Sequence, residues 1–355
     1  MKNDQPEAPI QVGYARSAAA AWVQETASRE KGFLGAYFSG STVGKPDYAY
    51  MSPSSDIDVV VVTSQAAPPM KLGKFVYRGV LIEVTPLSWN DLQSPEHVLS
   101  SYHLAGSFRI DSIIADPGGQ LGQLQRAVSQ QFARREWVRR RCENVRQKIE
   151  QGLSSIDTSA PFHDQVTSWL FPTGVMTHIL LVAALRNPTV RLRYAAVREV
   201  LQQYGLDGFY TELLELQGSA RLTPERVALH TDKLEETFDA AAAVARTPFF
   251  FSSDISAASR PIAIEGSSEL IRSGLHREAV FWIIATFARC HKILAADAPQ
   301  SLQQSLAPAF EAAVADLGIA STSDLLRRAE EARAFLPKLW ETTEVLLSSN
   351  PDIID

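Results

Sequence analysis

Four consecutive valines, Val59 to Val62, follow two aspartates at Asp56 and Asp58, and this segment constrains the fold more than any other. A run of β-branched residues this apolar predicts a strand that is covered on both faces. Side chains alternate along a strand, so both aspartates should share one face while Ile57 points into the core. Two carboxylates about 4 Å apart repel by roughly 4 kcal/mol at an effective dielectric near 20, a large part of a typical folding margin. A divalent cation would remove this repulsion, so the segment predicts a metal site where a buried strand begins.

A glycine-serine pair precedes this segment. Residues 32–38 predict a strand, and Gly40-Ser41 directly follows it. Glycine lets a phosphate approach the backbone, and the free amides at a helix start favour an anion. Residues 40–45 also look like a P-loop, but one residue is missing between the glycines and Pro46 stands where a metal-binding Ser or Thr is needed. We reject the P-loop and keep Lys45 as a residue that could contact a triphosphate.

A third polar residue interrupts a predicted strand after the aspartates. Segments 74–77 and 80–87 flank Arg78-Gly79 as the arms of a hairpin, and Glu83 lies within the second arm. A half-exposed edge strand would explain Glu83 without any function. If this arm instead lies beside the aspartate strand, Glu83 approaches Asp56 and Asp58. Three carboxylates suit a two-metal phosphoryl-transfer site, with magnesium as the fitting ion and one carboxylate as proton acceptor. Glu96 is the alternative base if Glu83 faces the other way.

The pattern of predicted elements changes near residue 118. Before it, helix and strand signals alternate, from a helix over residues 18–29 to a last strand over residues 108–115. After it, helical periodicity dominates, as in an apolar stripe at spacings i, i+4, i+7 and i+11: Val138, Cys142, Val145 and Ile149. We therefore expect an α+β fold, with a small mixed-sheet domain over residues 1–118 and an all-helical bundle over residues 119–355.

The composition disfavours several classes of protein. The 355 residues carry a net charge of −6, which argues against a general nucleic-acid binder. No apolar run approaches the ~20 residues of a membrane span, and residues 1–7 lack the apolar stretch of a secretory signal. Cys142 and Cys290 lie far apart within helical patterns, so we expect no structural disulfide and a cytoplasmic location.

The ordered motifs resemble the DNA polymerase β-type nucleotidyltransferase superfamily. Its pattern is a strand, Gly-Ser, a loop, and then Asp-x-Asp at the start of the next strand. Within it the chain is most similar to aminoglycoside adenylyltransferases of the streptomycin/spectinomycin kind, whose Leu-Glu-Val-Thr strand is matched by residues 82–85. That family also has a helical domain after its nucleotidyltransferase domain. The motifs span about 50 residues, and the loop between Ser41 and Asp56 is longer here than in the compact pattern.

The resemblance implies an activity and a set of roles. The expected reaction is a magnesium-dependent transfer of a nucleoside monophosphate, AMP from ATP, to a hydroxyl of a small molecule. Gly40 and Ser41 would hold the triphosphate, and Asp56 and Asp58 would bind two magnesium ions. Glu83 would complete the metal site and activate the acceptor hydroxyl. The helical domain would choose the acceptor, an aminoglycoside or another small molecule.

Two other classes of function stay open. A nucleotide-binding regulatory or antitoxin-like module would keep the fold without turnover, although all three carboxylates are present. A nucleotidyltransferase acting on a protein or an RNA would share the same site. Several arginines crowd the segment 134–148, where interspersed glutamates favour a solvated helix face over a phosphate-binding one.

Overall fold

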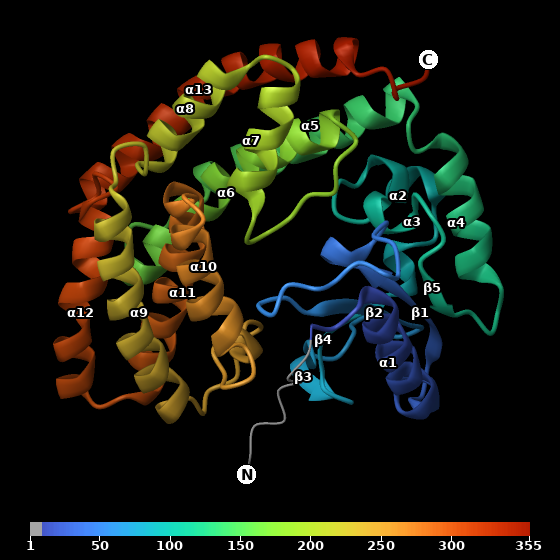
Figure 1. The fold of residues 1–355 in the computed structure, drawn as a ribbon, viewed down its shortest axis with the longest axis horizontal. Coiled ribbons are helices and arrows are strands. Elements are labelled where there is room, and N and C mark those ends of the chain that lie inside the picture. Colours follow the sequence, from blue (N-terminus) through green and yellow to red (C-terminus); the bar gives the residue numbers. More distant parts are fainter. Residues whose placement is uncertain (1–8) are drawn as a thin grey trace. The chain divides into compact units, whose positions relative to one another are not determined.

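The computed structural model describes residues 9–355, and the chain is α+β. Two compact units divide it, one reaching Arg141 and including Ile353–Asp355, the other spanning Cys142–Asp352. A five-stranded mixed sheet lies in the first unit, whereas the described residues of the second form helices and connections without a strand (Figure 1). The first unit extends beyond the boundary expected near residue 118. The reason is that α4 (Gln120–Gln131) packs its apolar side chains into the core beside the sheet.

The strands of the first unit form one sheet in the order β3-β4-β2-β1-β5. Their bounds are β1 Phe33–Ser39, β2 Ile57–Thr63, β3 Gly73–Tyr77, β4 Val80–Ser88 and β5 Ile113–Ala115. β2 pairs antiparallel with β1 and parallel with β4, so it lies at the centre of a mixed sheet. The valine run therefore occupies the central strand.

Both faces of β2 are covered. Ile57 and Val59 belong to a core cluster with residues of α1 (Val12–Glu25). Val60 and Val62 belong to a second cluster with residues of α2 (Pro95–Ser100), α3 (Ala105–Phe108) and α4. Figure 1 shows α1 on one side of the sheet and these three helices on the other. The prediction of a strand covered on both faces is confirmed, and it follows from the β-branched residues at successive positions.

Local signals placed the turns correctly, but two predicted elements have other bounds in the structure. The helix predicted over residues 18–29 is α1, which begins at Val12 and ends at Glu25. The hairpin predicted at residues 78–79 is present, and both turn residues have positive φ, 49° at Arg78 and 73° at Gly79. Ser94 caps α2 by accepting from the amide of His97 at 3.3 Å. The strand predicted over residues 108–115 is wrong for its first five residues, because β5 begins only at residue 113. Phe108 instead ends α3, where it is fully buried.

The second unit is built from long helices. After the shared helix α5 (Arg135–Ser154) these are α6 Phe162–Ala183, α7 Arg193–Gln203, α8 Asp207–Gln217, α9 Pro224–Val244, α10 Gly266–Arg272, α11 His276–Asp297, α12 Gln300–Ala315 and α13 Thr322–Ser349. The apolar stripe predicted on α5 is fully buried. α6 and α11 are long and apolar enough to cross a membrane, yet most of each is buried within the protein, which makes them weak indicators of a span.

The chain returns to the first unit after α13. The amide of Ile354 donates to the carbonyl of Ala133 at 3.0 Å, and the amide of Arg135 donates to the carbonyl of Ile354 at 2.8 Å. The side chain of Arg135 also pairs with Asp355. The helical unit is therefore an insertion between two segments that pair with each other in the first unit.

Candidate functional site

A row of polar residues crosses the sheet near the start of β2. The strand register pairs Ser39 with Asp58, Asp58 with Glu83, and Glu83 with Lys74. Residues paired across neighbouring strands share a face of the sheet, so these four side chains project from one face of β1, β2, β4 and β3. Ile57 alternates with them and packs on the α1 side, so the row lies on the opposite face.

Three carboxylates converge in this row. Asp56, Asp58 and Glu83 each offer one oxygen, and these oxygens all lie within 4.8 Å of one another. The side chains of Asp56 and Glu83 are mostly buried, 18% and 12% exposed. The expectation that Glu83 approaches the two aspartates is confirmed, because the arm that carries it is the parallel neighbour of β2. Oxygen donors grouped in this way fit a hard divalent cation such as Mg²⁺.

Gly40 makes room for one of these carboxylates. It opens a short 3₁₀ turn, Gly40–Thr42, directly after β1, with φ +68°. A Cβ atom at Gly40 would lie 1.7 Å from Oδ2 of Asp58 and 2.5 Å from its Cγ. A side chain fits there only if the carboxylate of Asp58 moves away, so this placement of Asp58 requires a glycine for both its backbone conformation and its missing side chain. Ser41 follows on the exposed side of the same turn.

Two lysines contact the carboxylates, although neither was predicted from the sequence to belong to the site. Nζ of Lys74 lies 3.4 Å from Oδ2 of Asp56 and 3.2 Å from Oε2 of Glu83. The ammonium of Lys71 is bonded to Oε1 of Glu83. The signal for Lys74 was present in the hairpin, because counting back from the Arg78-Gly79 turn places residue 74 opposite residue 83. Lys71 precedes β3 and no pairing rule identifies it.

Charge and burial shift the titration of the three acids. Burial raises the pKa of Asp58 well above its usual value, and the charges of Asp56 and Glu83 raise it further. Burial also raises the pKa of Asp56, although Lys74 opposes this. At Glu83 burial alone would raise the pKa, but the ammoniums of Lys74 and Lys71 together outweigh it and lower the pKa to about 2. Glu83 is therefore ionised, whereas the aspartates hold protons more tightly than free carboxyls.

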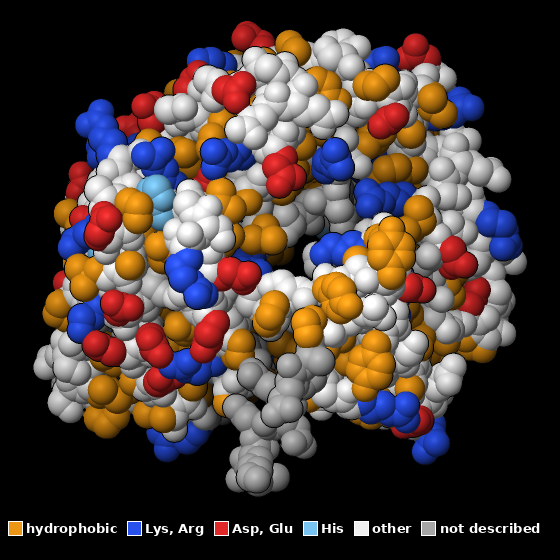
Figure 2. Space-filling view, in the orientation of Figure 1, with side chains coloured by type: hydrophobic (Ala, Val, Ile, Leu, Met, Phe, Trp, Pro, Cys, Tyr) orange, Lys and Arg blue, Asp and Glu red, His pale blue; other side chains and the backbone are white. Residues whose placement is uncertain are grey.

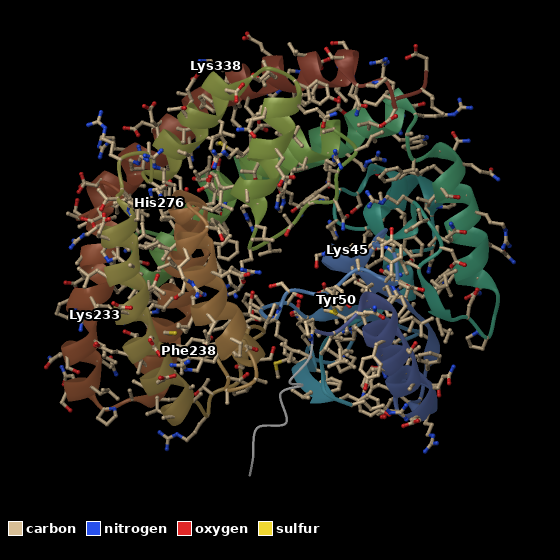
Figure 3. The ribbon with its side chains drawn as sticks, viewed as in Figure 1. Lys45, Tyr50, Lys233, Phe238, His276 and Lys338 are labelled. Atoms are coloured by element: carbon tan, nitrogen blue, oxygen red, sulfur yellow. The ribbon has the colours of Figure 1, made fainter. Side chains whose placement is uncertain are left out.

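Three cationic side chains lie around the turn that follows Gly40. Arg16 of α1 donates to the carbonyl of Thr42 at 2.7 Å. Arg109, just after α3, donates to the carbonyl of Val43 at 3.4 Å. Lys45 lies on the exposed loop itself (Figure 3). Only Lys45 could be predicted from the sequence, because the two arginines are far away in the chain and no motif connects them to the turn.

The remaining candidates are accounted for by local structure. Glu96 is exposed in the first turn of α2, where it accepts from Oγ of the N-cap residue Ser94 at 2.6 Å and where a negative charge favours the start of the helix. The arginine-rich helix α5 forms exposed i, i+4 ion pairs, Arg140 with Glu136 and Arg146 with Glu150, which supports a solvated face. Lys/Arg and Asp/Glu side chains are also interspersed over the second unit on the face shown in Figure 2.

Comparison of the chain with known protein families and with curated proteins finds no match. The geometry offers three carboxylates that could hold a cation, a glycine turn against one of them, and cationic side chains around that turn. This combination can bind a metal together with a polyanion such as a nucleoside triphosphate.

Proposed function

We propose that this protein is a magnesium-dependent nucleotidyltransferase, which transfers a nucleoside monophosphate, AMP from ATP, to a hydroxyl of a small molecule. The observation that carries the proposal is the convergence of three carboxylates within 4.8 Å: Asp58 and Glu83 on two parallel neighbouring strands, and Asp56 directly before the first of them. The contact of Gly40 with Asp58 adds support, because it brings the turn expected to receive phosphates against a metal ligand. The resemblance of the ordered motifs to polymerase β-type nucleotidyltransferases points to the same reaction.

Each residue has a defined role in this reaction. Asp56, Asp58 and Glu83 would hold Mg²⁺, which when bound supplies charge neutralisation to the phosphates. The turn at Gly40-Ser41 would orient the triphosphate. The acceptor oxygen then attacks the α-phosphorus in line, the new O–P bond forms as the bond to the leaving pyrophosphate breaks, and Glu83 takes the hydroxyl proton. Catalysis is mainly positioning and electrostatic stabilisation in this scheme.

The acceptor is proposed only as a class. The helical unit would supply its specificity, as the helical domain does in the family that the motifs resemble. The chain is acidic overall, with a net charge of −6, and the charges on the face shown in Figure 2 are mixed in sign. A polycationic aminoglycoside is compatible with such a surface, as are neutral metabolites that carry hydroxyl groups.

The decisive experiment measures pyrophosphate release. The protein is incubated with Mg²⁺, each labelled nucleoside triphosphate, and a panel of aminoglycosides and hydroxylated metabolites. Asp58→Asn removes a charge at nearly constant shape and should abolish release. The matched control is Asp91→Asn on an exposed residue of the same unit, which should leave release unchanged.

Other outcomes separate the alternatives. Nucleotide binding without release under any acceptor would identify a catalytically silent module. Transfer of label onto an added protein or RNA would identify a macromolecular acceptor. Release that persists at the wild-type rate in Asp58→Asn would refute the metal assignment.

A further inference from the structure

Lys74 is buried although its position does not require burial. It lies on β3, an edge strand of the sheet, and its side chain is 7% exposed. Val76, two residues along on the same face of the strand, is 56% exposed. A lysine at such an edge can extend its ammonium into water. The ammonium of Lys74 instead reaches across β4 and contacts the carboxylates of Glu83 on β4 and of Asp56, the residue before β2.

The oxygens that Lys74 contacts are those of proposed metal ligands. Its Nζ lies 3.2 Å from an oxygen of Glu83 and 3.4 Å from an oxygen of Asp56. Mg²⁺ needs ligand oxygens at about 2.0–2.1 Å in near-octahedral geometry. An ammonium and a divalent cation repel each other and cannot both sit against the same pair of carboxylates without a cost. Binding of the metal and retention of this lysine contact therefore oppose each other.

The charge balance of the cluster limits how much positive charge it can hold. When all three carboxylates are ionised, as metal ligation requires, they give −3, and the ammoniums of Lys71 and Lys74 give +2, which leaves −1. One divalent cation brings the total to +1, and a second would bring it to +3. The negative charge of the cluster therefore supports binding of one divalent cation. A second cation requires additional negative charge from the phosphates of a nucleotide, or the displacement of a lysine ammonium from the carboxylates.

We propose that Lys74 is the resident counter-ion of the carboxylate cluster in the metal-free protein and competes with the first divalent cation for Asp56 and Glu83. This inference rests on the metal site of the proposed function. Lys74 is in this sense a positioning residue, which keeps Asp56 and Glu83 together before the metal binds and is displaced from them afterwards. The wild-type protein should bind one divalent cation per chain without nucleotide.

The test is a titration with Mn²⁺ followed by electron paramagnetic resonance, without any nucleotide. Lys74→Met keeps the length of the side chain and removes the ammonium. We expect it to bind Mn²⁺ at least about tenfold more tightly than the wild type, because it removes a positive charge next to the ligands. The same variant should be less stable than the wild type in a chelator and should recover that loss when Mn²⁺ is added.

The control is Lys31→Met, an exposed lysine of the same unit, which should leave Mn²⁺ affinity unchanged. A folded Lys74→Met protein with equal or weaker Mn²⁺ affinity would refute the inference. If that variant does not fold, Lys71→Met tests the same charge effect at a side chain that is 27% exposed, and unchanged affinity there would also count against it. Pyrophosphate release plays no part in these readouts. Absent release would therefore refute the proposed function and leave the competition standing.

Discussion

Gly40→Ala is the most direct test of the link between the phosphate turn and the metal site. The new Cβ would lie 1.7 Å from Oδ2 of Asp58, and real Cβ contacts are essentially never closer than 3.0 Å. The carboxylate must therefore retreat by at least about 1.3 Å, the difference between these distances. A misplacement of about 1 Å in a catalytic group can cost on the order of 100-fold in rate. We expect a loss of that size in pyrophosphate release and weaker Mn²⁺ binding.

The substitution also strains the backbone, and this effect needs its own control. An alanine in the left-handed region costs about 1–2 kcal/mol. Gly119 has nearly the same conformation, φ +69° against +68° at Gly40, and a Cβ there would meet nothing within 4 Å. Gly119→Ala should therefore lower the free energy of unfolding by the backbone cost alone and leave release and Mn²⁺ affinity intact.

The assays are urea unfolding, Mn²⁺ titration and pyrophosphate release on both variants. The comparison isolates the effect of moving the carboxylate, because both alanines carry the same backbone strain. If Gly40→Ala binds Mn²⁺ and releases pyrophosphate as well as Gly119→Ala does, the placement of Asp58 against the turn has no functional role and the reasoning fails.

Three further predictions concern stability. Ile57→Ala empties a fully buried position between the two aspartates and should cost about 2–5 kcal/mol in urea unfolding; a cost under about 1 kcal/mol would contradict the packing on α1. Burial lowers the pKa of His178 to about 3. Below pH 6.5 this histidine therefore binds a proton in the unfolded chain but stays neutral in the folded one. Stability should be full above pH 6.5 and fall by roughly 1.4 kcal/mol per pH unit towards pH 3, a loss that His178→Gln removes. Buried Arg141 donates to the carbonyls of Leu99 and Phe132 at 3.0 and 2.6 Å, so Arg141→Met should cost about 3 kcal/mol by chemical denaturation.

The sequence predicted the carboxylate cluster because its geometry follows from short-range rules. Alternation along a strand places Asp56 and Asp58 on one side, and the hairpin after them brings Glu83 into the neighbouring strand. The same register rule would have identified Lys74, which pairs with Glu83 across the hairpin. That lysine was missed because a single cation in an apolar strand usually indicates only that the strand lies at the edge of a sheet, where a lysine reaches water.

Other parts of the site depend on contacts that the sequence pattern does not encode. Arg16 and Arg109 reach the turn after β1 from a helix before it and from a segment after α3, and only the packed fold brings them there. Phe108 lies in a β-prone segment, yet burial against Tyr37, with ring centroids 4.6 Å apart, holds it in α3. Tertiary packing overrode local propensity at that position.

The return of residues 353–355 to the first unit has a consequence for biosynthesis. Arg135 and Asp355 pair across 220 residues of sequence. A ribosome adding about 5–20 residues per second needs roughly 11–44 s to make that stretch. The five strands and α4 are translated before this interval, so the nascent sheet must persist on its own while the helical unit is made. The hydrogen bond between Ile354 and Ala133 then completes the first unit as a late step of folding, because the helical unit lies between these two residues and is synthesised first.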